Sequence, residues 1–151
     1  MVRQSVGFVE FRDLQFKTRA RIIINRFPED NTTGLFLDLD VDGLGVLGAG
    51  DCEIGLDRGN TKRLLTLVQQ AASVSPTKNH LQHPEGEAEF SWSDHSKSGE
   101  DDGTVLVESN GATARMIIRT RTGTWAPYVA TFSSANLDEL SALLSRALHE
   151  S

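Results

Sequence analysis

The sequence has little of what most secreted or membrane proteins need. Cys52 is its single cysteine among 151 residues, so an internal disulfide is excluded. The N-terminal stretch MVRQSVGFVEFRD contains no apolar run long enough for a signal peptide or a membrane span. We therefore expect a cytoplasmic protein of bacterial type.

The motifs of common enzymes are also missing. The sequence has no GxSxG nucleophile elbow, no GxxxxGK[ST] phosphate loop, no CxxC and no HExxH. His80 and His83 form an HxxH, with Asp94 and His95 as possible further ligands, but without those partners they are expected to be loop histidines. Cys52 opens a strand without a nearby histidine, so we expect a buried apolar side chain. The sequence predicts a non-enzymatic protein with neither metal nor cofactor.

Positive charge is scarce as well. The formal net charge is -6, which repels the chain from phosphate backbones and anionic lipids, although a local basic patch remains compatible with it. A hydrophobic fraction of 38% over this length suits one domain. A protein partner is therefore expected before nucleic acid, and no membrane association is expected.

The stretch GLFLDLDVDGLGVL, residues 34–47, has two interpretations. Asp38, Asp40 and Asp42 followed by glycine match the start of a calcium loop, but its twelfth position, which needs a bidentate Glu, is Ala49. The residues instead alternate between apolar and polar, as in a half-buried strand, and Asp42-Gly43 is a favoured hairpin turn. We predict that residues 35–41 pair with residues 44–47.

The three aspartates form an acidic row on one strand face. The preceding segment KTRARIIINRF is predicted to be a strand that places Lys17, Arg19 and Arg21 on the same side. A register that sets Arg21 opposite Asp40 and Arg19 opposite Asp42 would pair the charges. Alternatively, part of the row stays unpaired and meets a basic partner.

Strands followed by a helix are predicted twice. In the first half, DCEIGLDRGNTKRLLTLVQQAASV begins as a strand and continues as a helix that Asn60 caps and that stops near Val74. In the second half the predicted strands are EAEFSWSD, GTVLVES, ATARMIIRTRTG and WAPYVATFSS, and the final helix NLDELSALLSRAL starts with a capping box of Asn136 and Glu139. The expected apolar stripes are Leu64, Leu67, Val68 and Ala71, and Leu140, Leu143, Leu144 and Ala147.

The two ends also align without gaps. The sequence of residues 52–71 aligns with that of residues 128–147, and the residues of the two apolar stripes fall at matching positions. The sequence therefore predicts one α+β domain over residues 1–151, in which antiparallel sheet packs against two helices. Its pseudo-repeat halves are about 1–75 and 86–151, and a polar loop, residues 75–86, connects them.

Two further surface features are candidate binding sites. The loop HSKSGEDDG carries three acidic residues at its tip, and with the acidic row it forms the expected partner-binding set: Asp38, Asp40, Asp42, Glu100, Asp101 and Asp102. The segment ARMIIRTRTGTW places cations on one strand face near an aromatic residue, which is the arrangement that holds single-stranded nucleic acid. That alternative set is Arg115, Arg119, Arg121 and Trp125, although strand arginines often pair with carboxylates such as Glu108.

The order and spacing of GLDRGNTKRLLTLVQQA, EAEFSWSD and PYVATFSSANLDELSALLSRAL resemble the small immunity proteins of bacterial polymorphic-toxin systems, such as the WapI type. The resemblance spans about residues 5–148 and is one of pattern, without a diagnostic motif. It implies a non-enzymatic inhibitor that masks a toxin's active site, and the acidic charge would suit a basic nuclease toxin through electrostatic steering. The plan also resembles Whirly-like single-strand binding domains, against which the net charge argues.

Overall fold

The chain folds into two antiparallel sheets and two helices. The computed structural model describes residues 2–39, 51–76, 80–82, 86–93, 102–121 and 127–149. The first half contains β1 (Gln4–Arg12), β2 (Arg19–Phe27), the short 3-10 helix η1 (Pro28–Asp30), β3 (Thr32–Leu39), β4 (Asp51–Leu56) and α1 (Arg58–Ala72). The second half contains β5 (Ala88–Phe90), β6 (Trp92–Ser93), β7 (Gly103–Ser109), β8 (Thr113–Thr120), β9 (Tyr128–Ser133) and α2 (Asn136–His149).

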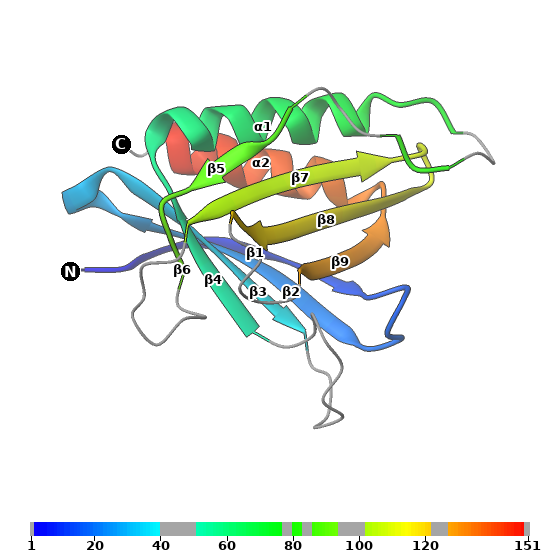
Figure 1. The fold of residues 1–151 in the computed structure, drawn as a ribbon, viewed down its shortest axis with the longest axis horizontal. Coiled ribbons are helices and arrows are strands. Elements are labelled where there is room, and N and C mark those ends of the chain that lie inside the picture. The colour runs from blue at the N-terminus through cyan, green and yellow to red at the C-terminus, as the bar shows by residue number, and fades with distance from the viewer. Residues whose placement is uncertain are drawn as a thin grey trace.

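The strands divide between sheet A, in the order β1-β2-β3-β4-β6, and sheet B, in the order β5-β7-β8-β9. Neighbouring strands pair antiparallel throughout both sheets. In Figure 1 the helices lie side by side along one edge of the molecule, and the strands of sheet A cross those of sheet B at an angle. The fold is α+β with antiparallel sheet and two helices in the described residues, as the sequence predicts.

Alternation of apolar and polar residues determines which face of each strand is buried. In β3, Leu35, Leu37 and Leu39 are buried while Phe36 and Asp38 are only half-buried, as the sequence predicts. The inward residues of both sheets and the apolar stripes of both helices form one cluster of buried side chains. Both predicted stripes are buried in full: Leu64, Leu67, Val68, Ala71, Leu140, Leu143, Leu144 and Ala147.

The predicted hairpin over residues 35–47 is wrong. Leu35 pairs with Ile54 and Leu37 with Cys52, so β3 lies against β4 rather than against residues 44–47. The other edge of β3 is occupied by β2, which leaves no edge for the predicted partner. β4 is almost entirely buried, and lengthening a loop costs little entropy, so the longer connection is favoured. The Asp42-Gly43 dipeptide lies outside the described residues.

The segment EAEFSWSD, predicted as one strand, is also divided. β5 pairs with β7 in sheet B, whereas β6 pairs with β4 in sheet A. Ser91 lies between the two strands, and its backbone N–H donates to the Gly55 carbonyl over 2.9 Å. The alternation continues through this residue, so periodicity alone does not reveal the change of sheet.

The starts of the two helices differ from the predicted caps. Asp57 caps α1, because its carboxylate accepts from the backbone N–H of Asn60 over 2.8 Å; Asn60 is therefore inside the helix. Asn136 is the first residue of α2, and its side-chain amide lies 3.5 Å from a carboxylate oxygen of Glu139. A capping box needs each side chain to accept from the other residue's backbone N–H, so this contact between two side chains does not confirm the predicted box.

Each helix packs mainly on the sheet of the other half of the chain. Among the described elements, α1 lies chiefly against β5 and β7, and α2 lies chiefly against β1 and β2. The helices also contact each other along their lengths. The order of strands then helix occurs twice, while an internal repeat remains a prediction. Neither α1 nor α2 has the length and apolar character needed to span a membrane.

Candidate functional site

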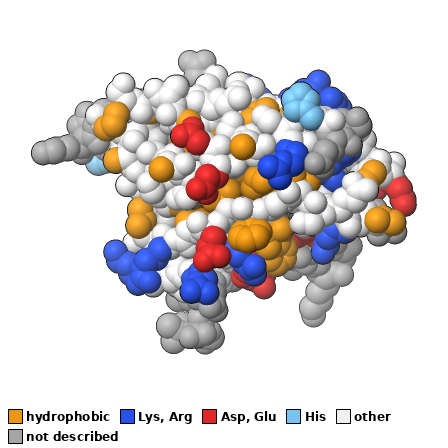
Figure 2. Space-filling view, turned by 180° about the vertical axis from the view of Figure 1, so that it is seen from behind, with side chains coloured by type: hydrophobic (Ala, Val, Ile, Leu, Met, Phe, Trp, Pro, Cys, Tyr) orange, Lys and Arg blue, Asp and Glu red, His pale blue; other side chains and the backbone are white. Residues whose placement is uncertain are grey.

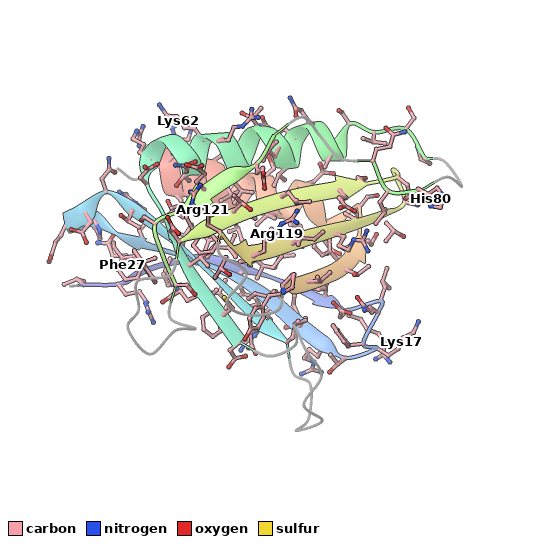
Figure 3. All side chains as sticks on the ribbon, in the orientation of Figure 1. Lys17, Phe27, Lys62, His80, Arg119 and Arg121 are labelled. Carbon is pink, nitrogen blue, oxygen red and sulfur yellow. The ribbon has the colours of Figure 1, made fainter. Side chains whose placement is uncertain are left out.

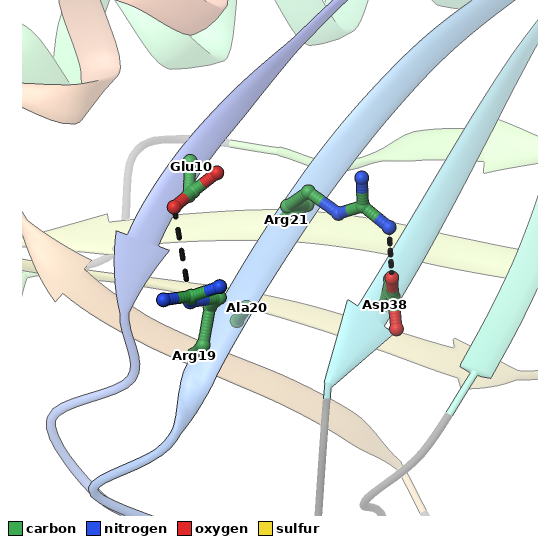
Figure 4. A pocket seen from close by; sticks show the side chains of 5 residues that line it. All are labelled: Glu10, Arg19, Ala20, Arg21 and Asp38. Carbon is green, nitrogen blue, oxygen red and sulfur yellow. Dashed lines mark hydrogen bonds and ion pairs between the residues drawn. The ribbon is translucent and has the colours of Figure 1, made fainter.

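The outer face of sheet A, which points away from the core, carries a charged row across three adjacent strands. Glu10 of β1 lies opposite Arg21 of β2, and Arg21 lies opposite Asp38 of β3. The Arg21 Nη2 donates to Asp38 Oδ2 over 2.8 Å, and the Arg19 Nε lies 3.9 Å from Glu10 Oε1 (Figure 4). Together with Ala20 these residues line a hollow of about 430 Å³.

Asp38 is thus paired rather than free. Its hydrogen bond with Arg21 and its negative charge raise the pKa of the Arg21 guanidinium above its usual value. The predicted cross-strand pairing of acids and bases is correct in kind, but the register differs by two residues, since Asp38 rather than Asp40 lies opposite Arg21. Asp40 and Asp42 lie outside the described residues.

A row of apolar side chains runs beside the charged row. Phe8, Ile23 and Phe36 lie opposite one another on β1, β2 and β3. Phe8 is 56% exposed, Ile23 and Phe36 are half-buried, and the Arg21 guanidinium lies 5.9 Å from the centre of the Phe8 ring. Figure 2 shows hydrophobic side chains bordered by acidic and basic ones in the lower half of that face. We call Phe8, Ile23 and Phe36 with Glu10, Arg21 and Asp38 the sheet A face.

The sequence interpretation did not identify Phe8, Glu10, Ile23 or Phe36 as site residues. The segment GFVEFR of β1 does alternate, because Val9 and Phe11 are buried while Phe8 and Glu10 are exposed. An exposed phenylalanine between charged residues was the available signal. Bringing it beside Ile23 and Phe36 requires the strand register, which local alternation does not specify.

On the outer face of sheet B, the predicted arginines are largely paired. Arg115 and Arg119 do share one face of β8, as the sequence predicts. Arg115 Nη2 lies 2.6 Å from a carboxylate oxygen of the buried Glu108, the pairing that the sequence indicated as the alternative to binding. Arg119 is exposed and has no ion pair within the described part of the chain. Trp125 lies outside that part.

The two predicted sites meet at Arg121. Its guanidinium lies 3.3 Å from Asp102 and 3.4 Å from Glu89, and the charge of Asp102 with its hydrogen bond raises the pKa of Arg121. A residue of the predicted acidic loop, Asp102, thus pairs with a residue of the predicted arginine row, Arg121, which is labelled in Figure 3. Glu100 and Asp101 lie outside the described residues.

The histidines and the cysteine offer no site in the described ranges. His80 is exposed in the loop after α1, whereas His83, Asp94 and His95 are not among the described residues. Those ranges contain no group of three or more side chains placed to hold a metal ion. Cys52 is fully buried, as predicted, with its Sγ 3.9 Å from Ser93 Oγ.

The described geometry therefore offers an exposed face with apolar side chains beside paired charges. Of the predicted charged sites, the described residues Asp38, Asp102, Arg115 and Arg121 are paired within the chain. Neither models of protein families nor curated protein sequences match this chain.

Proposed function

We propose that this chain is a non-enzymatic binding protein that docks another protein on the sheet A face. The observation that carries the proposal is the apolar row of Phe8, Ile23 and Phe36 beside the ion-paired row of Glu10, Arg21 and Asp38. Protein interfaces combine an apolar, aromatic and arginine-containing centre with a polar rim. A strongly exposed phenylalanine in a strand is difficult to explain by folding stability alone.

Charge balance favours protein over nucleic acid as the partner. On the sheet A face, Glu10 and Asp38 oppose Arg21, so a phosphate backbone crossing it would meet two carboxylates. On sheet B, Arg115 and Arg121 are already paired with carboxylates of the chain. The single-stranded nucleic-acid module is therefore the less supported alternative.

More specifically, we propose that the protein inhibits a toxin. The resemblance in element order to immunity proteins of the WapI type motivates this step, together with the negative net charge of -6, which would steer a basic toxin. A flat sheet face suits an inhibitor, because it can cover an active site without chemistry of its own. Of the predicted acidic set, Asp38 belongs to the sheet A face.

Capture of partners from lysate of the native host, with the tagged full chain and with Phe8→Glu, tests the proposal. Ala142→Glu, which alters an exposed residue of α2, is the matched control. We expect a protein that wild type and Ala142→Glu retain and that Phe8→Glu loses, since placing a charge in an apolar hot spot weakens binding by about tenfold or more. That protein, expressed in a bacterium, should arrest growth unless wild type is co-expressed.

Two results would contradict the proposal. Equal capture of every protein by Phe8→Glu and wild type would exclude the sheet A face as the docking surface. Capture of oligonucleotides that is lost in Arg119→Gln would favour the nucleic-acid module instead.

A further inference from the structure

The turn between β1 and β2 is fixed by a buried carboxylate. Asp13 is fully buried, and its Oδ1 accepts from the backbone N–H groups of Gln15 at 2.9 Å and Phe16 at 2.8 Å. Its Oδ2 accepts from the N–H of Thr131 in β9 over 2.9 Å, and the Leu14 N–H donates to the Thr131 carbonyl. The turn is therefore tied to sheet B and holds its exposed side chains in defined positions.

The conformation of Lys17 within this turn is unusual. Its φ of 58° lies in the left-handed region, which residues with a Cβ rarely adopt. Its backbone N–H donates to the Asp13 carbonyl, and the Asp13 N–H donates to the Thr18 carbonyl. Such strain persists only where the surroundings impose it, and it is concentrated at functional sites.

Three cations gather at this end of the hairpin. Arg12 lies directly opposite Arg19 across β1 and β2, and Lys17 is exposed in the turn between them. Arg19 is 78% exposed in its side chain and reaches only Glu10, at 3.9 Å, while Arg12 and Lys17 have no ion pair among the residues described. Figure 3 labels Lys17 at the lower right. In Figure 2, which is seen from behind, Lys and Arg side chains lie on the corresponding side, at the lower left. We call Arg12, Lys17 and Arg19 the basic hairpin end.

Within the described part of the chain, Glu10 alone offsets this cluster of positive charge. Like charges directly opposite each other on paired strands repel, and their side chains start only about 5 Å apart. A carboxylate placed between two guanidinium groups would relieve the repulsion and accept charge-assisted hydrogen bonds from both. In a chain of net charge -6, this local cationic cluster gives an acidic ligand one preferred place of approach.

Apolar side chains beside the cations indicate the class of ligand. The large hydrophobic residues that are exposed in the described structure are Val2, Phe8 and Leu14. Leu14 lies in the turn between Arg12 and Lys17, and Phe8 lies four residues before Arg12 on β1. Glu10 lies between Phe8 and Arg12 on the same face of β1. A phosphate chain would be repelled by that carboxylate, whereas a peptide can place acidic and apolar side chains alternately.

We infer that the basic hairpin end binds an acidic segment of the protein partner. Its carboxylates lie between Arg12 and Arg19 and near Lys17, and its apolar side chains pack on Leu14 and Phe8. This inference rests on the proposed function and adds the chemistry of the partner to it: the segment that reaches the hairpin is acidic even where the rest of the partner is basic.

Selection of random short peptides displayed on phage against the immobilised full chain tests the inference. We expect enrichment of peptides in which Asp or Glu neighbour Leu, Ile or Phe. For a synthesised peptide of this kind, Arg12→Gln/Arg19→Gln should weaken binding by about tenfold or more, because two charge-assisted contacts are lost. Arg119→Gln is the matched control, because Arg119 of sheet B is also exposed and has no ion pair with any described residue. This variant should change binding by less than about twofold.

A loss of binding can be distinguished from a loss of folding. Removing two like charges that face each other should leave the thermal midpoint of the double variant unchanged or higher. Absence of acidic peptides from the selection, or equal binding to the double variant, would overturn the inference. So would binding of oligothymidylate, but not of peptides, that depends on Arg12 and Arg19. Suppose that Phe8→Glu fails to capture the host protein while Arg12→Gln/Arg19→Gln still captures it. The sheet A face is then supported as the docking surface, and the binding of an acidic segment at the basic hairpin end is contradicted.

Discussion

The carboxylate of Asp13 links the turn after β1 in sheet A to β9 in sheet B. It is fully buried, yet both of its oxygens accept backbone hydrogen bonds, from Gln15 and Phe16 in its own turn and from Thr131 in β9. A buried carboxylate is retained at a structural position only when such donors satisfy it.

Replacing Asp13 with Ala should lower the free energy of unfolding by about 2–4 kcal/mol, because three partly buried backbone N–H groups lose their acceptor. Urea unfolding followed by circular dichroism measures the change. Asp30→Ala, in the exposed η1, is the matched control and should change stability by less than about 0.5 kcal/mol. Equal stabilities of the two variants would show that water replaces the carboxylate without cost.

Residue chemistry could be predicted from the sequence better than residue position. The sequence predicts that arginines of β2 pair with aspartates of the following strand, and Arg21 does pair with Asp38. The predicted partner Asp40 was two residues away, because the register depends on how β2 and β3 are connected through η1. The pairing of Arg121 with Asp102 could not be predicted, since it depends on β7 lying beside β8.

At the scale of elements, α2 approaches β1 closely where β1 has a bulge. The register between β1 and β2 shifts between Ser5 and Gly7, and a Cβ added at Gly7 would lie 2.6 Å from Leu143 Cδ2. Arg146 of α2 donates to the Val6 carbonyl over 3.2 Å at the same place. Glycine therefore permits the contact between the last helix and the first strand.

Leu143→Ala should destabilise the protein by about 2–5 kcal/mol, since it leaves a cavity beside β1. Gly7→Ala should also destabilise it, but the new methyl group clashes with a side chain that Leu143→Ala removes. We therefore expect the double variant to be more stable than the sum of the single effects indicates. A double-mutant cycle of urea unfolding measures this coupling. Additive effects would mean that Leu143 moves aside freely.

The bulge also explains why β1 was not recognised as a strand in the sequence. Val6 and Val9 are both buried although they are three positions apart, an odd spacing, so the alternation is broken within β1. By contrast, GTVLVES was predicted with the bounds that β7 has, since its short apolar run of Val105, Leu106 and Val107 lies between turn residues. The sheet A face was missed because Phe8 meets Ile23 and Phe36 only through the strand register, which the sequence does not specify.

For the whole molecule, the decisive feature is the packing of each helix on the other half's sheet. α1 lies chiefly against β5 and β7, whereas α2 lies chiefly against β1 and β2, and β6 of the second half pairs with β4 of the first. Each half therefore leaves much of its sheet to be covered by the helix of the other half. The sequence predicted two helices with one apolar stripe each, but the stripes carry no information on which sheet they cover.

Residues 1–75 expressed alone should therefore not fold cooperatively, although they contain four strands and a helix of the described structure. Without α2, the inward faces of β1 and β2 stay exposed to water, which removes their contribution to the core. Thermal unfolding followed by circular dichroism should show no sharp transition for this fragment and one for the full chain. Co-expression with residues 86–151 should restore the transition. A cooperative transition of the fragment alone would contradict the exchange of helices.

The contact of α2 with β1 and β2 has a consequence during synthesis. The first strands leave the ribosome long before the helix that covers them, so the apolar face of sheet A has no cover while the second half is being translated. Stable folding of even the earliest strands must then wait until α2 has emerged. During that interval the nascent sheet is exposed to aggregation, and slow codons placed before α2 would prolong the exposure.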